Sequence, residues 1–249
     1  AYTNFLDEKN SSVFAIDNLE CKYSNRNVAC MVIIMQALAL GGFAADLQMI
    51  EAPNYARELK LVAEGQVAIM HQDAWQISIP EQAFQSSEII AKGHLFKGIY
   101  VAEKHQKRFN IDTVDDLKPY TAVSNPEWIV GWNTLDKIGL KALYKAAKKE
   151  HMFNLVLFRG VDFTIQEFAN TDDLSYKFKQ GRLVPIPGVK LGLDGTRHFV
   201  ISKKHPQGPA IYKALETGLS QLRARGTIER FLTESGFYRK EVLNWKTIS

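Results

Sequence analysis

The chain alternates short apolar runs with longer segments of helical periodicity, and this alternation constrains the fold more than any other feature. Asn54 precedes one helical segment as a predicted N-cap, and Gly65 follows it as the residue that ends it. Strand and helix segments alternate in the predicted order 13–17 (strand), 27–40 (helix), 47–51 (strand), 55–64 (helix) and 66–70 (strand). A strand-helix-strand order of this kind is typical of a parallel α/β sheet.

A second run of the same type follows. Strands are predicted at 98–102, 121–124, 153–158 and 182–186, and helices at about 112–117, 126–146 with a break at Gly139, and 171–180. The segment LVAEGQVAIM of the first run matches KFKQGRLVPI of the second, because a helix end, a glycine and an apolar strand follow in order. Each run is therefore predicted to form one α/β unit. The chain is then predicted to end in a strand at 197–202 and helices at 207–224 and 226–234.

The most apolar segment, Val28–Ala45, approaches the roughly 18–20 residues that a membrane span needs. Gln36 lies near its middle, and Gly41-Gly42 is predicted to end the helix. We interpret the segment as a buried helix followed by a turn, and a membrane span is the alternative. The first residues lack a basic stretch followed by an apolar one, so the expectation is a mature chain whose precursor carries a signal peptide.

The chain has two cysteines, Cys21 and Cys30, on either side of a polar segment. A disulfide between them would join a loop to the start of a helix and would suit an oxidising compartment. The alternative is two free, half-buried thiols. No CxxC or HxxxH spacing accompanies them, so no metal site is expected.

Composition excludes several classes of function. Lys and Arg total 31 and Asp and Glu total 27, so the net charge is only +4, and no long basic run suggests a nucleic-acid partner. Apolar residues form 46% of the chain, as expected of an ordered globular protein. The sequence has no GxSxG, HExxH, P-loop or strand-linked GxGxxG motif. We therefore expect no enzyme activity and no cofactor.

Three segments resemble bacterial extracellular solute-binding proteins of family 3. RELKLVAEGQVAIM resembles the family's R-x-L-x-x-L-x-x-G-x-x-D segment, and GIYVAEKHQKRFNIDTVDDLKPYTAVS resembles its strand followed by an L-x-DL segment. RHFVISKKHPQGPAIYKALETGLSQLRARGTIERFLTESGF resembles the closing strand and helices. The order and spacing of the three segments together, over residues 13–238, carry the resemblance.

The resemblance implies an α/β fold of the type II periplasmic-binding-protein kind, with ligand bound in a cleft between two lobes joined by two crossing segments. The first lobe would take residues 1–95 and 195–249, and the second would take 96–194. The stretch HQDAWQISIPEQAF lacks the arginine with which amino-acid binders of the family grip a carboxylate. Ala68 or Ile69 stands where the family often has aspartate.

Ligands of open α/β sheets bind outside the carboxyl ends of the strands, which selects a limited set of loops. Tryptophan faces can stack on a ligand, the alternative being packing within one lobe. Asp73 could pair with an amine and His71 could hydrogen-bond, the alternative being an exposed turn. Arg159 could grip a carboxylate in place of the missing arginine, the alternative being an ion pair with Asp162. The predicted ligand-binding residues are Asp17, His71, Asp73, Trp75, Asn125, Trp128 and Arg159.

By this resemblance the chain would be a periplasmic, extracytoplasmic protein that captures a small polar or aromatic solute. The solute would then pass to the membrane permease of an ABC-type transporter. The alternative is the ligand-sensing input domain of a membrane signalling protein. We expect a monomer with a small-molecule ligand and no nucleic-acid partner.

Overall fold

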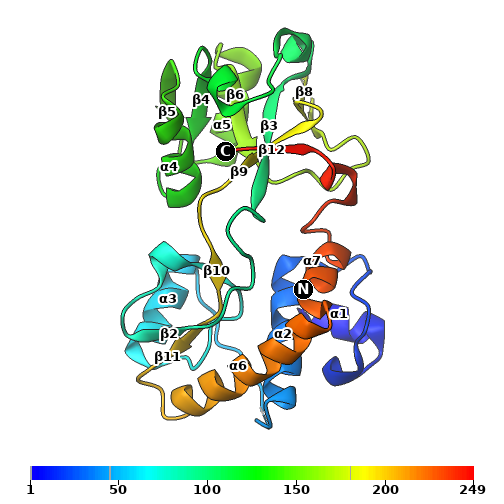
Figure 1. The fold of residues 1–249 in the computed structure, drawn as a ribbon, viewed down its shortest axis with the longest axis vertical. Helices are drawn as coiled ribbons and strands as arrows, with labels where there is room; N and C mark the ends of the chain where they lie inside the picture. The colour runs from blue at the N-terminus through cyan, green and yellow to red at the C-terminus, as the bar shows by residue number, and fades with distance from the viewer. Residues whose placement is uncertain (1, 45, 180) are drawn as a thin grey trace. The chain divides into compact units, whose positions relative to one another are not determined.

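The structure is a computed structural model, and it describes residues 2–44, 46–179 and 181–249 (Figure 1). The chain divides into two compact units. Unit 1 comprises Ala1–Ala91 and Thr196–Lys240, and unit 2 comprises Lys92–Gly195 and Glu241–Ser249.

Unit 1 is mostly helical. Its helices are α1 (Tyr2–Lys9), α2 (Arg26–Leu40), α3 (Tyr55–Glu64), α6 (Gly208–Ala224) and α7 (Thr227–Glu234), with 3-10 helices η1 (Val13–Ala15) and η2 (Gln76–Ser78). Its strands form two antiparallel pairs, β1 (Ala74–Trp75) with β10 (Arg197–His198) and β2 (Ala83–Gln85) with β11 (Val200–Ser202). The parallel sheet expected for this part of the chain is therefore absent from the residues that the structure describes.

Helix α2 is the centre of unit 1. The Asn25 side chain accepts a hydrogen bond from the Val28 N–H and so satisfies a free donor at the start of the helix. The helix ends at Leu40, and Gly41 follows as its C-cap, as the sequence predicts. Most of its side chains are buried, and it packs against α6 (Figure 1). Among the described residues, no helix is long and apolar enough to cross a membrane.

Helix α3 begins and ends where the sequence predicts. The Asn54 side chain accepts a hydrogen bond from the Arg57 N–H at 2.9 Å. Gly65 has a φ of 84°, a left-handed conformation that glycine adopts without steric cost. The apolar face of α3 packs beside a cluster formed by Val62, Met70, Ala74, Ala83 and Val200.

Unit 2 is built on one sheet with the strand order β12-β9-β3-β6-β4-β5, in which β8 also pairs with β3 and β7 pairs with β8 (Figure 1). The strands are β3 (Phe96–Ala102), β4 (Thr121–Ser124), β5 (Ala142–Lys145), β6 (Phe163–Gln166), β7 (Tyr176–Phe178), β8 (Gly181–Pro185), β9 (Val189–Gly192) and β12 (Lys246–Ile248). The helices are α4 (Ile129–Ile138) and α5 (Lys149–Phe158), with η3 (Glu103–Arg108), η4 (Val114–Leu117) and η5 (Lys240–Val242). Strand β4 is parallel to both β5 and β6.

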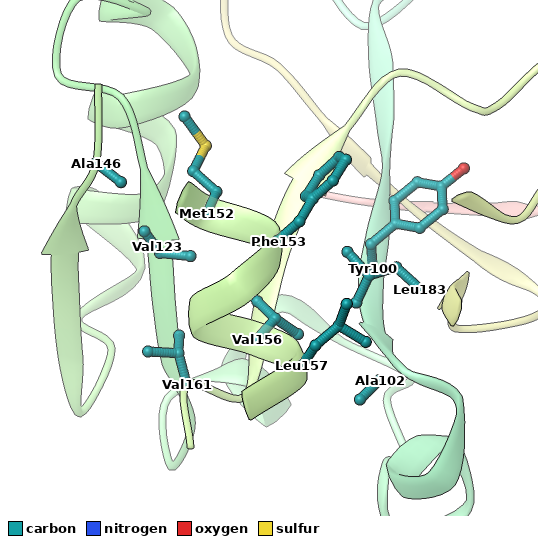
Figure 2. Packing of buried hydrophobic residues seen from close by; sticks show 10 residues of the cluster. All are labelled: Tyr100, Ala102, Val123, Ala146, Met152, Phe153, Val156, Leu157, Val161 and Leu183. Atoms are coloured by element: carbon teal, nitrogen blue, oxygen red, sulfur yellow. The ribbon is translucent and has the colours of Figure 1, made fainter. Parts of the chain in front are cut away.

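Helix α5 covers one face of this sheet with an apolar surface. Its residues Phe153, Val156 and Leu157 point toward Tyr100 and Ala102 of β3 (Figure 2). Tyr100 is fully buried, and its hydroxyl donates to the Leu174 carbonyl at 2.8 Å. The hydroxyl therefore has a hydrogen-bond partner within the apolar cluster.

Several predicted elements differ from those observed. Residues 13–15 form a 3-10 helix, and residues 46–52 form no strand and are mostly exposed. Residues 66–70 contribute only an isolated bridge between Ile69 and Ile201. The predicted helix at 126–146 is divided into α4 and β5 at Gly139, where φ is 74°.

The clearest error is at 153–158, predicted as a strand but observed inside α5. The run FNLVLF is apolar at almost every position because one face packs on the sheet, and a short apolar run does not distinguish a strand from a buried helix. The predicted helix at 171–180 is instead a turn followed by β7, and its last position, 180, lies outside the described residues.

The C-terminal segment also differs from the predicted division into lobes. Residues 241–249 were expected in the first lobe, but β12 pairs in parallel with β9 of unit 2. The buried Lys190 donates through Nζ to the carbonyls of Val242 at 2.7 Å and Leu243 at 2.9 Å. These bonds and the strand pairing hold the segment in unit 2.

Candidate functional site

The loop that carries the predicted site residues His71, Asp73 and Trp75 contains a fully buried carboxylate, that of Asp73. Arg197 donates to it through Nε, and donates through Nη2 to the Asp73 backbone carbonyl at 2.6 Å. The Nε of Arg26 lies 3.5 Å from the other carboxylate oxygen, Oδ1, to which the Cys30 thiol also donates at 3.5 Å. No local sequence signal predicts this cluster, because its members lie far apart along the chain.

Burial acts most strongly on Asp73 and by itself would raise the pKa of the carboxyl. The guanidinium groups of Arg197 and Arg26 outweigh it, and the pKa stays below its usual range. Asp73 is therefore ionised, and both of its oxygens are engaged inside unit 1. In this geometry Asp73 fixes the position of the Arg197 side chain. The predicted contact of Asp73 with a ligand amine stays a prediction.

Trp75 lies beside the same arginine. It is directly opposite Arg197 in the β1–β10 pair, and the guanidinium carbon is 4.8 Å from the centre of its ring. The Trp75 backbone N–H donates to the Tyr55 hydroxyl at 3.3 Å. The half-buried indole is thus contacted by a cation, and the backbone of the same residue is tied to α3.

His71 is tied to helix α3 by a buried acid, Glu58. The His71 backbone N–H donates to Glu58 Oε1 at 3.0 Å, ring Nδ1 contacts the same oxygen, and Gln72 Nε2 donates to Oε2 at 3.0 Å. Burial opposes ionisation of Glu58 most strongly, but the hydrogen bonds from His71 and Gln72 keep its pKa below the usual value. The pair anchors the loop that carries Asp73 and Trp75 to α3.

Asp17 does not join this group. It lies after η1 and not after a strand, and its side chain is exposed. Its backbone carbonyl accepts a hydrogen bond from Arg230. Within the part of the chain that the structure describes, no recorded contact connects Asp17 with Asp73 or Trp75.

In unit 2 the strands β4, β5 and β6 are parallel, so their last residues, Ser124, Lys145 and Gln166, share one side of the sheet, here called the carboxyl edge. The Ser124 hydroxyl is buried, and it has no hydrogen-bond partner among the described residues. A buried hydroxyl normally has a partner, so this one is available to a bound molecule.

Asn125 and Trp128 follow Ser124 at this edge. The Asn125 amide donates to the Ala147 carbonyl at 3.1 Å, and its oxygen accepts from the Glu127 N–H at 2.9 Å. The asparagine side chain therefore shapes the turn that leads into α4. Trp128 is the N-cap residue of α4, and Lys97 Nζ lies 5.1 Å from its ring centre.

Arg159 does not lie at the carboxyl edge, because the segment before it is a helix and not the predicted strand. It is the C-cap of α5, which crosses the sheet before β6 begins. The next acid, Asp162, accepts hydrogen bonds at 2.9 Å and 2.8 Å from Thr121, the first residue of β4. Arg159 therefore lies near the amino ends of the parallel strands, opposite the carboxyl edge. Arg108, and not Arg159, lies near Asp162, at 3.6 Å.

The predicted disulfide is absent, since Cys21 and Cys30 are both free. Cys30 is buried inside α2 with its thiol directed to Asp73, whereas Cys21 is half-exposed. Burial raises the pKa of the Cys30 thiol well above its usual value. Among the described residues, no group of His, Cys, Asp or Glu side chains is placed to hold a metal ion.

Arg197 and His198 make contacts inside unit 1 that are typical of structural residues. His198 is buried, with Nδ1 2.7 Å from the Ser86 carbonyl and Nε2 2.7 Å from the Thr196 hydroxyl. The sequence reasoning did not select Glu58, Lys97 or Lys145. Lys145 is the last residue of β5, and Lys97 is the second residue of β3, so both lie close to the edge where ligands of α/β sheets bind.

No protein-family model matches the chain, and no curated protein matches its sequence. Solved structures do match it. The probable amino-acid ABC transporter extracellular-binding protein YtmK from Bacillus subtilis has a TM-score of 0.55 and 15% identity, with 82% of this chain and 86% of that chain covered. Substrate-binding domain 2 of GlnP from Lactococcus lactis has a TM-score of 0.54 and 16% identity, with coverage of 83% and 84%.

A third similar structure is the periplasmic VFT2 domain of BvgS from Bordetella pertussis. Its TM-score is 0.56 and its identity 12%, with 84% of this chain and 83% of that chain covered. At these identities the likeness concerns the fold. The chain has the two-unit α/β fold of type II periplasmic binding proteins, as the sequence resemblance implied.

Proposed function

We propose that this chain is an extracytoplasmic solute-binding protein that captures a small polar or aromatic solute and delivers it to an ABC-type transporter. The observation that carries the proposal is the buried Ser124 hydroxyl, without a partner among the described residues, at the carboxyl edge beside Trp128. Ligands of α/β sheets bind at such edges. YtmK is a probable amino-acid ABC transporter extracellular-binding protein and the GlnP structure is a substrate-binding domain, and the likeness to both supports the proposal.

Five of the seven predicted residues have a proposed part in binding, and Asp17 and Arg159 have none. Trp75 and Trp128 offer indole surfaces to the solute, and Asn125 shapes the turn that presents Trp128. Asp73 acts through Arg197, which it holds against Trp75. His71 fixes the loop through Glu58. That the solute lies between the two lobes stays a prediction.

The second candidate is the input domain of a membrane signalling protein. The likeness to the periplasmic domain of BvgS favours it, with a TM-score as high as that of the transport-related structures. The same solute site would serve either role. The full-length gene product distinguishes them, because a sensor continues into a membrane helix and a signalling domain.

A thermal-shift screen against several hundred metabolites tests the proposed function. A ligand present at about 100 times its Kd adds about 2.7 kcal/mol to the unfolding free energy, which raises the melting temperature measurably. Trp128→Ala should abolish the shift with the ligand that is found, and Arg159→Ala, at the opposite edge, should retain it. If no metabolite shifts the melting temperature, the proposed function is wrong.

A further inference from the structure

Strand β5 is the last strand of the sheet in unit 2. It pairs with β4 on one side, and among the described residues no strand pairs with its other side (Figure 1). An edge strand presents backbone N–H and C=O groups that have no partner in the sheet. A further extended segment can therefore join the sheet at β5.

The backbone groups that face this open side belong to Leu143 and Lys145. The Ala146 N–H donates to the Ser124 carbonyl at 3.0 Å, so the backbone of Ala146 faces β4. Successive residues of a strand turn their backbone groups to opposite sides, and Tyr144 therefore also faces β4. Outside the β4–β5 pair, Leu143 and Lys145 make no recorded backbone hydrogen bond in the part of the chain that the structure describes.

The side chains of β5 give its two faces different chemistry. Tyr144 is directly opposite Val123, which packs in the cluster with α5, so the tyrosine lies on the α5 side, where it is 48% exposed. The neighbouring Lys145 points to the other side, and its Nζ lies 5.8 Å from the ring centre of Trp132 in α4. The strand thus carries an aromatic ring on one face and a cation on the other.

The positive charge extends on both sides of β5 along the chain. Residues 136–150 contain five lysines and two acids. Three of these lysines are exposed and pair with no acid among the described residues, namely Lys141, Lys145 and Lys148. Lysines on an edge repel the same edge of a second copy, so the charge disfavours self-pairing and favours an acidic segment.

The acids of this region do not cancel the charge. Asp136 of α4 and Glu150 of α5 are the two acids within residues 136–150, and both are exposed. Glu167 follows β6, which is separated from β5 by β4 in the strand order. Lysines therefore outnumber acids beside the open side of β5.

We propose that the open side of β5 docks an extended segment of a partner protein in which acidic and apolar residues alternate. The backbone of the segment bonds to the outward N–H and C=O groups of Leu143 and Lys145, as in other cases of strand addition. Its acidic side chains lie beside Lys145 on the α4 side, and its apolar side chains lie beside Tyr144 on the α5 side. This surface is separate from the proposed solute site, and the proposal does not depend on solute binding.

A short peptide in which glutamate and valine alternate tests the proposal on the full chain. Fluorescence anisotropy of the labelled peptide gives the affinity, and hydrogen exchange read by mass spectrometry locates the contact. We expect saturable binding that weakens as salt is added, with slower exchange in residues 141–146. A peptide of the same composition, with all glutamates before all valines, should bind at least about tenfold more weakly because it cannot place acids on one face and valines on the other.

Two substitutions at one position separate charge from backbone pairing. Lys145→Met removes the cation but keeps the N–H, and should weaken binding about two- to fivefold, as expected for an exposed ion pair. Lys145→Pro also removes the outward N–H, which an edge strand tolerates, and should weaken binding at least about tenfold. Lys107→Met removes an exposed lysine of η3, which packs against β3 and β8, and should leave binding unchanged. Circular dichroism melting checks that each variant is folded.

Equal binding of the two peptide orders would overturn the proposal, because attraction by charge alone would then explain the result. So would equal affinities of Lys145→Met and Lys145→Pro, or unchanged exchange in residues 141–146 at millimolar peptide. If Lys145→Pro does not fold, the comparison of the two peptides and the exchange data still decide. Self-association of the natural chain that Lys145→Pro abolishes would assign the edge to a second copy and would also contradict the proposal.

Discussion

Arg197 holds both the side chain and the backbone of Asp73, although 124 residues separate them along the chain. The pairing of β1 with β10 places the two strands together, with Trp75 opposite Arg197. The ion pair therefore joins the loop of candidate residues in unit 1 to the strand by which the chain re-enters that unit.

Removal of the Asp73 charge should destabilise the protein strongly. Asp73→Asn leaves the buried Arg197 without its counter-ion, and breaking a buried ion pair in this way costs about 3–5 kcal/mol. Urea unfolding followed by circular dichroism measures the loss. Asp172→Asn, at an exposed site, is the matched control and should change the unfolding free energy by less than about 0.5 kcal/mol. Equal stability of the two variants would contradict the role of Asp73.

The ion pair of Asp73 with Arg197 also predicts how the unfolding free energy depends on pH. The folded-state pKa of Asp73 lies below the value of about 3.9 expected in the unfolded chain. Its contribution is therefore fully present above about pH 4 and is lost as the pH falls through the folded-state pKa. Unfolding free energies measured from pH 6 to pH 3 should fall less steeply in Asp73→Asn than in the natural chain. Parallel curves for the two proteins would show that Asp73 titrates normally.

The two cysteines should differ in their reaction with iodoacetamide. Native protein should gain one adduct, at the half-exposed Cys21, because Cys30 is buried and its thiol pKa is raised. Denatured protein should gain two adducts without any reductant. Intact-mass spectrometry counts them. If denatured protein gains adducts only after reduction, the cysteines are bridged and the observed geometry at Cys30 is incorrect.

Because α2 and α6 pack closely, we expect replacement of Gly218 by alanine to lower the stability of the protein. A Cβ at Gly218 would lie 1.9 Å from the Ala37 carbonyl oxygen, so the helices would have to separate. Helix propensity alone would make Gly218→Ala stabilising by about 1 kcal/mol. We expect instead a loss of about 1–3 kcal/mol from overpacking, measured by thermal unfolding. Ser220→Ala, on the exposed side of α6, should change stability little, and a stabilising Gly218→Ala would refute the close contact.

Local signals predicted the helices of unit 1 well. Asn54 and Gly65 mark α3 correctly because each acts on the backbone within three residues of itself. The apolar run at 153–158 was wrongly predicted as a strand. Burial against a sheet makes a short helix as apolar as a strand. Because of this error, Arg159 was expected at the end of a strand, whereas the structure places it at the end of helix α5, near the opposite edge of the sheet.

The candidate site was only partly predictable for a related reason. Trp128 and Asn125 were found because they follow β4 directly. The engagement of Asp73 by Arg197 depends on which strands become neighbours. Such pairings are set by tertiary packing across the whole chain, and no spacing within one segment reveals them. Cys30 is similar, since its partner Asp73 lies 43 residues away.

Native mass spectrometry of the purified protein tests solute binding most directly. The protein is purified without refolding and weighed under native and then denaturing conditions, and any released molecule is identified. We predict a native mass above that of the chain by the mass of one small molecule, which is lost on denaturation and absent from the Trp128→Ala variant. A native mass equal to that of the chain alone, unchanged after incubation with a metabolite extract, would contradict the account.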